Sequence, residues 1–451
     1  MKMEKNGVIS MTQGNPLRLI VSFALPLMAG NIFQQLYTVA DTAIVGRAIG
    51  VEALAALGAV DWLNWMVLGV IQGITQGFSI LIAQKYGSKE MEQMRKVVGN
   101  SCTFSALCAV VLCAAAQLAV NPAVALLKAP EQITPLACAY LRVIFWGIPI
   151  MMIYNMAASI LRALGDSKTP LYAMLAASAT NIALDLLFVL AFNWGVRGAA
   201  AATVLAQVLA SAYCIAAIRK IQVLRMDRSH FKPERTVGQK LFILAAPMAF
   251  QNGIIAVGGM VVQSVVNGFG VAFIAGFTAT NKLYGVLEVA ATSYGYAMVT
   301  YTGQNVGAGD KKRVSDGLRA GLLIGMLTSL VITAVMLLFG RNILSCFISS
   351  GEEAGGETLE IAFRYLKIMS ICLPVLYVLH IVRSTIQGMG NTVIPLISGI
   401  SELVMRTGAA LLLPTIFGQN GILFAEITAW AGADMILVPG YFYGKKKMDH
   451  S

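Results

Sequence analysis

The chain contains one module twice, at an offset of about 220 residues. Residues 162–170 and 387–395 carry a Gly, an Asp or Asn, and a Pro at matching positions. The same offset aligns Pro149 with Pro374. A repeat of this length fixes the unit of the fold before any single helix is assigned. The sequence therefore predicts two halves of the same architecture.

The composition is that of a membrane protein. Mean hydropathy is +0.72, and only 12% of residues are charged, where a soluble domain has about 25%. Each apolar stretch is long enough to cross a hydrocarbon core of about 30 Å. They lie at roughly 17–44, 53–83, 97–120, 136–161, 171–192, 198–218, 241–266, 271–302, 317–339, 361–386, 393–416 and 421–443.

These stretches are too long and too uniformly apolar for barrel strands, which have about 10 residues of alternating polarity. We therefore predict an all-α polytopic membrane protein with twelve transmembrane helices in two six-helix lobes related by a parallel internal repeat. The N-terminal lobe is expected at 1–218, a cytoplasmic linker at 219–240 and the C-terminal lobe at 241–451. A duplicated membrane half is typical of a transporter with its site between the halves.

The distribution of Lys and Arg predicts the orientation. With both termini in the cytoplasm, 24 of the 33 basic residues fall on the cytoplasmic side and seven on the outer side. This bias follows the positive-inside rule. It also accounts for the net charge of +11, so nucleic-acid binding is not expected. We predict a multi-pass protein of the plasma or inner membrane, in contact with the lipid bilayer, and a monomer.

Cysteine and histidine patterns give no sign of a metal site or a disulfide framework. The seven Cys lie mostly within apolar stretches and form no C-x-x-C motif, and the three His are far apart. We expect no cofactor, no bound metal and no enzymatic activity.

Small residues and prolines indicate how the helices pack. Gly69, Gly73 and Gly77 repeat every four residues, the spacing that lets membrane helices approach closely. Pro26 and Pro247 occupy the same position in the first helix of each half. Because proline removes a backbone hydrogen bond, each is expected either to fix a static kink or to act as a hinge.

Two carboxylates lie within apolar segments of the first half, where ionisable groups are costly and indicate function. Gln34, Tyr37 and Asp41 share one helical face. Asn181 and Asp185 are four residues apart and also share a face. Neither Asp has a basic residue one turn away.

The expected depths place Thr203 at the same level in the outer half of the bilayer as Asp41 and Asp185. Two carboxylates in a poorly solvated pocket cannot both stay charged without a cation, so one takes up a proton or the pair binds Na⁺. The alternative is that each Asp caps a neighbouring helix or pairs with an Arg from elsewhere.

The second half carries different ionisable residues. Glu402 and Arg406 are four residues apart and are expected to pair, whereas Arg383 is expected to extend to the cytoplasmic surface. His380 is either an ordinary hydrogen-bonded histidine or a proton site. Glu288 has no basic residue within a turn and is a candidate substrate contact. Further substrate-cavity candidates are Gln34, Gln72, Gln251, Asn252 and His380.

Several motifs together resemble the MATE (multidrug and toxic compound extrusion) family. They are FALPLMAGNIFQQLYTVADTAIVGR in the first segment, AQKYG and GQNVGAGD after the second and eighth, and RALGDSKTP with its mate after the fourth and tenth. The resemblance covers nearly the whole chain. It implies two six-helix lobes around a central cavity, and export of cationic, amphipathic compounds in exchange for Na⁺ or H⁺.

The resemblance also implies residue roles. In one prokaryotic branch the cation site lies in the N-terminal lobe, and its motif positions correspond to Asp41, Asn181, Asp185 and Thr203, with Tyr37 beside them. Another branch uses acidic residues in the seventh and tenth segments. Here the seventh has Gln251 and Asn252 instead, and the tenth has no acid in its core. This departure argues against the coupling site of the second branch.

The sequence thus predicts a secondary antiporter that exports an organic cation by alternating access, coupled to H⁺ or Na⁺ at Asp41 and Asp185. A lipid-linked oligosaccharide flippase of the same wider superfamily is the alternative, against which stand twelve segments and a single mid-membrane Arg406. A channel or receptor is a third reading. The patchy polar residues argue against it, because a channel needs a continuous polar lining.

Overall fold

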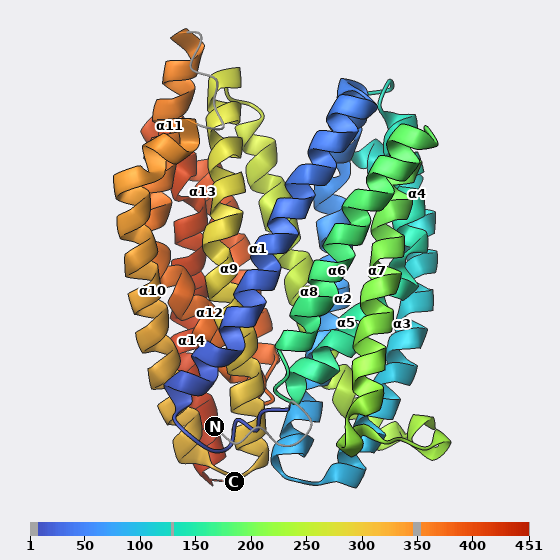
Figure 1. Cartoon of the computed structure of the whole chain (residues 1–451). Coiled ribbons are helices and arrows are strands. Elements are labelled where there is room, and N and C mark those ends of the chain that lie inside the picture. Colours follow the sequence, from blue (N-terminus) through green and yellow to red (C-terminus); the bar gives the residue numbers. More distant parts are fainter. Residues whose placement is uncertain (1–7, 128–129, 346–352, 451) are drawn as a thin grey trace. The chain divides into compact units, whose positions relative to one another are not determined.

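The computed structural model describes residues 8–127, 130–345 and 353–450, and its α-helices form the whole architecture (Figure 1). Backbone groups inside a bilayer have no water to bond, which favours helices that satisfy themselves. The described helices are α1 (Pro16–Ala48), α2 (Val51–Gly87), α3 (Met91–Leu126), α4 (Thr134–Trp146), α5 (Ile148–Ala163), α6 (Lys168–Asp185), α7 (Gly195–Lys220), α8 (Arg235–Val266), α9 (Val271–Gly307), α10 (Lys311–Ser345), α11 (Glu353–Ile371), α12 (Leu373–Gly388), α13 (Val393–Phe417) and α14 (Ala425–His450).

Two consecutive pairs of helices are bent spans. The axes of α4 and α5 meet at 48°, and so do those of α11 and α12. Each break is followed at once by a proline, Pro149 or Pro374, the two prolines that the repeat aligns. With each pair taken as one span, the described residues form six helices on either side of residues 219–240, which confirms the predicted fold class.

Length and apolarity alone identify fewer spans. Eight described helical stretches are long and apolar enough to cross a membrane, or ten when each bent pair counts as one. Helices α13 and α14 form one of them, a single 56-residue stretch, and α9 is not among the eight. Helix α9 carries Lys282 and Glu288 in its middle, and charged side chains within a span mark function more often than lipid contact.

The repeat also sets the turns that follow the bent spans. Gly165 and Gly390 have φ angles of 90° and 86°, which only glycine adopts without strain. Asp166 Oδ1 accepts hydrogen bonds from the backbone N–H groups two and three residues on, both at 3.0 Å. Asn391 Oδ1 does the same at 3.1 Å. Asp and Asn are thus equivalent helix caps here.

The chain divides into two compact units. Unit 1 comprises residues 1–13 and 25–249, and unit 2 comprises residues 14–24 and 250–451. The chain therefore passes from one unit to the other just before α1, within α1 next to Pro26, and within α8 close to Pro247. The lobe boundaries predicted from the sequence stay a prediction.

The linker of residues 219–240 is docked on α3 within unit 1. It contains the short helices η2 (Gln222–Leu224) and η3 (Arg228–Phe231). Asn100 Nδ2 donates to the carbonyls of His230 and Lys232, at 3.3 and 3.2 Å, and its Oδ1 accepts from the Glu234 N–H at 2.8 Å. His230 Nε2 lies 2.9 Å from Glu92 Oε1. These bonds fix the linker to the start of α3.

Glycines let α2 and α8 pack closely within unit 1. A Cβ at Gly73 would lie 2.7 Å from the Ala249 backbone, and one at Gly77 would lie 2.5 Å from that of Ala245. Side-chain atoms do not approach backbone so closely, so only glycine fits at these two positions. This contact agrees with the small-residue packing predicted from the sequence.

Candidate functional site

The centre of the site in unit 1 is a pair of carboxyl groups. Asp41 lies on α1, and Asp185 is the last residue of α6. Their side chains are within hydrogen-bonding reach of each other. Asp185 is completely buried. Directly after it the helix widens into the π-helix η1 (Leu186–Ala191), a distortion often found at functional sites.

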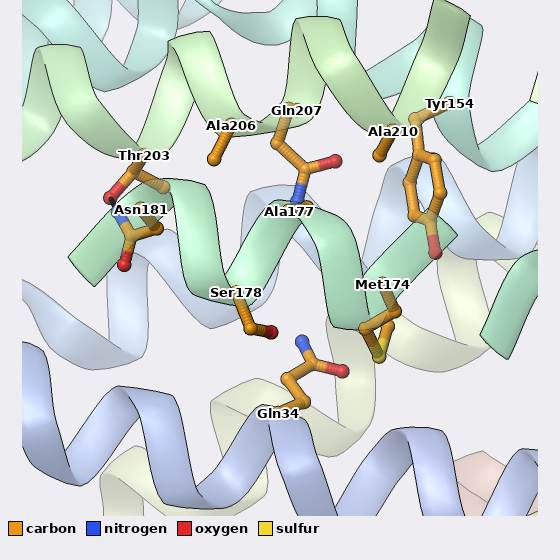
Figure 2. Close-up of a pocket in the computed structure, with 10 residues that line it drawn as sticks. All are labelled: Gln34, Tyr154, Met174, Ala177, Ser178, Asn181, Thr203, Ala206, Gln207 and Ala210. Atoms are coloured by element: carbon orange, nitrogen blue, oxygen red, sulfur yellow. Dashed lines mark hydrogen bonds between the residues drawn. The ribbon is translucent and has the colours of Figure 1, made fainter. Parts of the chain in front are cut away.

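Asn181 and Thr203 complete the predicted set. As drawn in Figure 2, Asn181 Nδ2 lies 3.4 Å from Thr203 Oγ1. The amide is better satisfied when turned by 180°, because Nδ2 then donates to Asp185 Oδ2 at 3.3 Å and Oδ1 accepts from the Thr203 N–H at 3.2 Å. Thr203 Oγ1 also donates to the Ala199 carbonyl at 3.2 Å. The structure thus brings Asp41, Asn181, Asp185 and Thr203 together.

Among the described residues, no cationic side chain compensates the charge of the carboxyl pair. In the described part of the chain, neither Asp41 nor Asp185 forms an ion pair. One oxygen of each, Oδ1, is buried without a hydrogen-bond partner. Burying unpaired negative charge is costly, so the pair must share a proton or hold a cation. Tyr37, which was also predicted for this site, has a side chain outside the described residues.

A small pocket is lined in part by Asn181 and Thr203, two residues of the predicted set (Figure 2). It has room for about one water-sized guest. Gln34 of α1 and Ser178 of α6 point toward each other across it, and Gln207 reaches in from α7. Ser178 Oγ and Gln207 Oε1 are buried without partners. The remaining lining residues are Tyr154, Met174, Ala177, Ala206 and Ala210.

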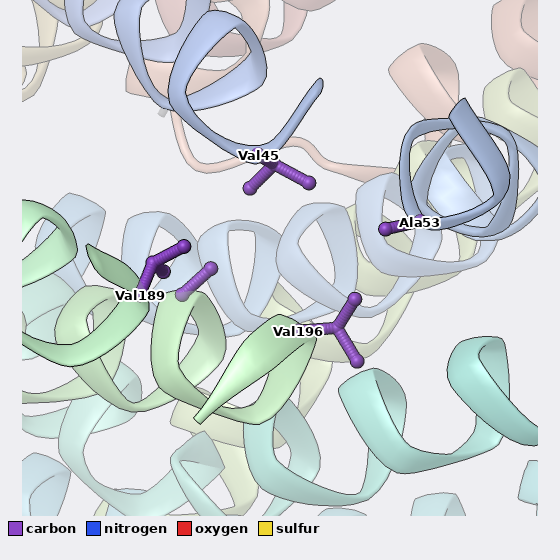
Figure 3. Close-up of a cluster of buried hydrophobic side chains, with 5 residues drawn as sticks. Val45, Ala53, Val189 and Val196 are labelled. Carbon is purple, nitrogen blue, oxygen red and sulfur yellow. The ribbon is translucent and has the colours of Figure 1, made fainter. Parts of the chain in front are cut away.

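Five buried apolar side chains of unit 1 form a cluster (Figure 3). Val45 and Val189 each lie four residues beyond one of the two Asp, that is one helical turn further along. They pack with Ala53, Val196 and Ala199, all at most 3% exposed. Along each of these two chain segments, polar pocket residues therefore precede the Asp and a residue of the apolar cluster follows it.

The remaining predicted cavity residues do not join this site. Gln72 is half-buried on α2. Gln251, on the unit 2 part of α8, is 2% exposed and accepts a hydrogen bond from Gln387 Nε2 at 3.3 Å. Its neighbour Asn252 is half-buried.

Unit 2 contains a buried network of four charged side chains. Glu402 accepts from Arg383 at 2.7 Å and from Arg406 at 3.0 Å. Arg406 also contacts Glu426 at 2.7 Å. The predicted pairing of Glu402 with Arg406 is confirmed. The prediction that Arg383 extends to the surface is wrong, since Arg383 is only 7% exposed. It can stay buried because Glu402 on α13 compensates its charge inside the unit.

A second contact in unit 2 joins two residues for which the sequence predicts no pairing. His380 Nε2 of α12 lies 3.3 Å from Glu288 Oε1 of α9. Their side chains are 18% and 33% exposed. Sequence reasoning found both residues singly but missed the pair. Only the packing of α9 against α12 brings them together.

Comparisons with known proteins agree with one another. The family model described as MatE matches residues 26–187 and 247–411. The chain is 30% identical to the probable multidrug resistance protein YpnP of Bacillus subtilis, over 91% of both chains. It is 27% identical to the probable multidrug resistance protein YoeA of the same organism, over 94% of this chain and 93% of the relative.

Solved structures show the same fold. A structure described as the outward-facing conformation of a multidrug resistance MATE family transporter superimposes with a TM-score of 0.90 at 23% identity. The match covers 100% of this chain and 99% of that one.

Proposed function

This chain belongs to the MATE family of multidrug efflux transporters, and from that premise we propose that it is a secondary active antiporter. It exports cationic, amphipathic compounds in exchange for H⁺ or Na⁺ by alternating access. It acts as a monomer in the plasma or inner membrane, with both termini in the cytoplasm. The coupling site consists of Asp41, Asp185, Asn181 and Thr203.

The observation that carries this proposal is the uncompensated carboxyl pair. Two buried carboxyl groups within hydrogen-bonding reach, without an ion pair in the described chain, require a proton or a monovalent cation. An ion that binds there in one conformation and leaves in the other drives the cycle, because it shifts the equilibrium only through its different affinities for the two states.

The surroundings of the pair suit a proton better than Na⁺. Sodium needs several oxygen ligands, as other hard cations do. The better-satisfied orientation of Asn181 turns its amide nitrogen, rather than its oxygen, toward Asp185. A proton needs only the two carboxyl groups themselves.

Alternating access requires that the ion reach its site from one side at a time. We propose that the apolar cluster of Val45, Val189 and their neighbours keeps water from one side of the carboxyl pair. The ion reaches the pair through the pocket of Gln34, Ser178 and Gln207, which offers oxygen atoms. Pro26 and Pro247 serve as hinges, since they lie where the chain passes between its two compact units.

The flippase alternative has less support. Binding the phosphate of a lipid-linked sugar calls for arginine side chains that are free to bind it. Arg383 and Arg406, the two guanidinium groups buried in unit 2, are both already paired with carboxylates. Accumulation of a lipid-linked precursor after deletion of the gene would favour the flippase.

The proposal is tested by efflux of a permanently cationic dye from proteoliposomes under separate Na⁺ and pH gradients. We expect Asp185→Asn to reduce gradient-driven efflux to the level of protein-free liposomes. The matched control is Asp166→Asn. Asp166 caps the start of α6 in the same unit. An Asn is expected to work there, because Asn391 forms the equivalent cap in the other copy.

Efflux that Asp185→Asn leaves unchanged, in protein that reconstitutes as well as the wild type, would contradict the coupling site. Antiport would be contradicted if the dye left the proteoliposomes equally fast with and without an ion gradient. The gradient that increases dye efflux more, Na⁺ or pH, identifies the coupling ion.

A further inference from the structure

We propose that Glu288 and His380 form a proton-controlled binding site for a cationic group in unit 2, separate from the carboxyl pair of unit 1. When His380 is neutral, the Glu288 carboxylate is free to bind the cation. When His380 is protonated, the two residues form an internal ion pair and the cation is released. The inference depends on the proposed function only for the cationic class of ligand.

The geometry places the two groups in direct contact. His380 Nε2 lies 3.3 Å from Glu288 Oε1. A Cβ at Gly295, two turns after Glu288 on α9, would lie 4.0 Å from His380 Nδ1. The imidazole therefore lies along the face of α9 that carries both Glu288 and Gly295. The same Cβ would lie 2.9 Å from Ser384 Oγ, so α9 and α12 pack closely beside the ring.

The exposure of the pair indicates access to water. Glu288 is 33% and His380 18% exposed, although each lies in the middle of its helix. Charged side chains in membrane helices face an aqueous cavity or other protein groups, because exposure to lipid is too costly. A solute can therefore reach this pair, whereas Glu402 and Arg406 beside it are each only 6% exposed.

Among the described carboxylates of unit 2, Glu288 is the one for which a direct contact with His380 is seen. The two arginines and two glutamates of the buried network carry equal and opposite charge and bond to one another. They already satisfy each other's charges. Protonation of His380 therefore decides whether Glu288 is neutralised within the protein or by a ligand.

The charged and titratable groups around the pair come from every helix packed against it. Helix α12 itself carries Arg383, and α13 carries Glu402 and Arg406. Helices α10 and α11 also pack against α9. The charges of α10 lie toward its ends, and on α11 Glu360 pairs with Arg341 while Arg364 donates to Asn420. The others are Lys282, Tyr284 and Tyr294 on α9, Tyr377 on α12, Glu426 and Asp434 on α14, Asp316, Arg319 and Arg341 on α10, and Glu360, Arg364, Tyr365 and Lys367 on α11.

The test is equilibrium binding of tetraphenylphosphonium to the full chain in nanodiscs between pH 5.5 and pH 8. This cation has no titratable group, so any pH dependence belongs to the protein. If one proton competes with it, affinity falls by up to about ten-fold per pH unit on acidification. We expect His380→Gln to remove this dependence and Glu288→Gln to lower affinity at pH 8 by about ten-fold or more.

The matched control is His230→Gln, because His230 also contacts a glutamate, Glu92, at 2.9 Å but on the docked linker. It should leave binding and its pH dependence unchanged. Wild-type pH dependence in His380→Gln, or wild-type affinity in a folded Glu288→Gln, would overturn the proposal.

An Asp185→Asn arm separates this inference from the function proposed above. If Asp185→Asn removes the pH dependence while His380→Gln keeps it, the proton acts in unit 1 and the unit 2 site is refuted. If Asp185→Asn abolishes coupled efflux yet binds tetraphenylphosphonium with the pH profile of the wild type, both sites stand as separate.

Discussion

The acidic residues of unit 1 and unit 2 illustrate two ways of burying carboxylates in one duplicated frame. Asp41 and Asp185 lie within hydrogen-bonding reach of each other and have no ion pair in the described chain. Glu402 is held by two arginines at 2.7 and 3.0 Å. The repeat aligns Asp41 and Asp185 with Val262 and Ala410, so each copy has its charges at different positions.

This difference distinguishes a carboxylate with a structural role from a carboxyl pair with a functional one. A carboxylate that protein cations already compensate has little need of an ion from solution, and removing it leaves buried positive charge behind. A carboxyl pair without such compensation takes its cation from outside, and removing one member relieves the site. The same substitution, acid to amide, should therefore have opposite effects on the stability of the two units.

The largest effect is expected for Glu402→Gln in unit 2. Because Arg383 and Arg406 lose their common partner while still buried, we expect the free energy of unfolding to fall by about 3–5 kcal/mol. Thermal unfolding in detergent measures this change. The exposed pair of Arg341 and Glu360, at 2.7 Å, provides the control, and Glu360→Gln should cost only about 0–1 kcal/mol. Similar losses for both variants would remove the distinction.

A smaller effect is expected for Gly77→Ala on α2. Its mate in the second copy is Ala297, so the change gives unit 1 the residue of unit 2. The new Cβ would meet the Ala245 backbone at 2.5 Å, and we expect a loss of about 1–3 kcal/mol. Gly58→Ala on the same helix has nothing within 4 Å of its Cβ. Its unfolding temperature should match or exceed that of the wild type.

The smallest effect, of opposite sign, is expected for Asp185→Asn. Replacing one of two uncompensated carboxyl groups with a neutral amide should raise the free energy of unfolding by roughly 1 kcal/mol, as at other sites that sacrifice stability for function. Thermal unfolding in Na⁺-free buffer measures it. A loss as large as that expected for Glu402→Gln would mean that Asp185 is a structural acid after all.

Much of the frame could be predicted from the sequence, because its signals are local. The aligned prolines give two spans the same 48° bend. The aligned glycines take positive φ angles in equivalent turns. Asn181 lies beside Asp185, and Glu402 beside Arg406, because residues four apart share one face of a helix.

The sequence by itself determined the duplicated helical frame, the absence of acidic mates for Asp41 and Asp185, and the residues that share a helical face. Only the tertiary structure decided that Arg383 pairs with Glu402 and that His380 contacts Glu288. It also decided which residues form the apolar cluster and the polar pocket of unit 1. The physical reason is that helical periodicity fixes neighbours along one helix. Neighbours on different helices depend on how those helices pack, which no spacing within the sequence specifies.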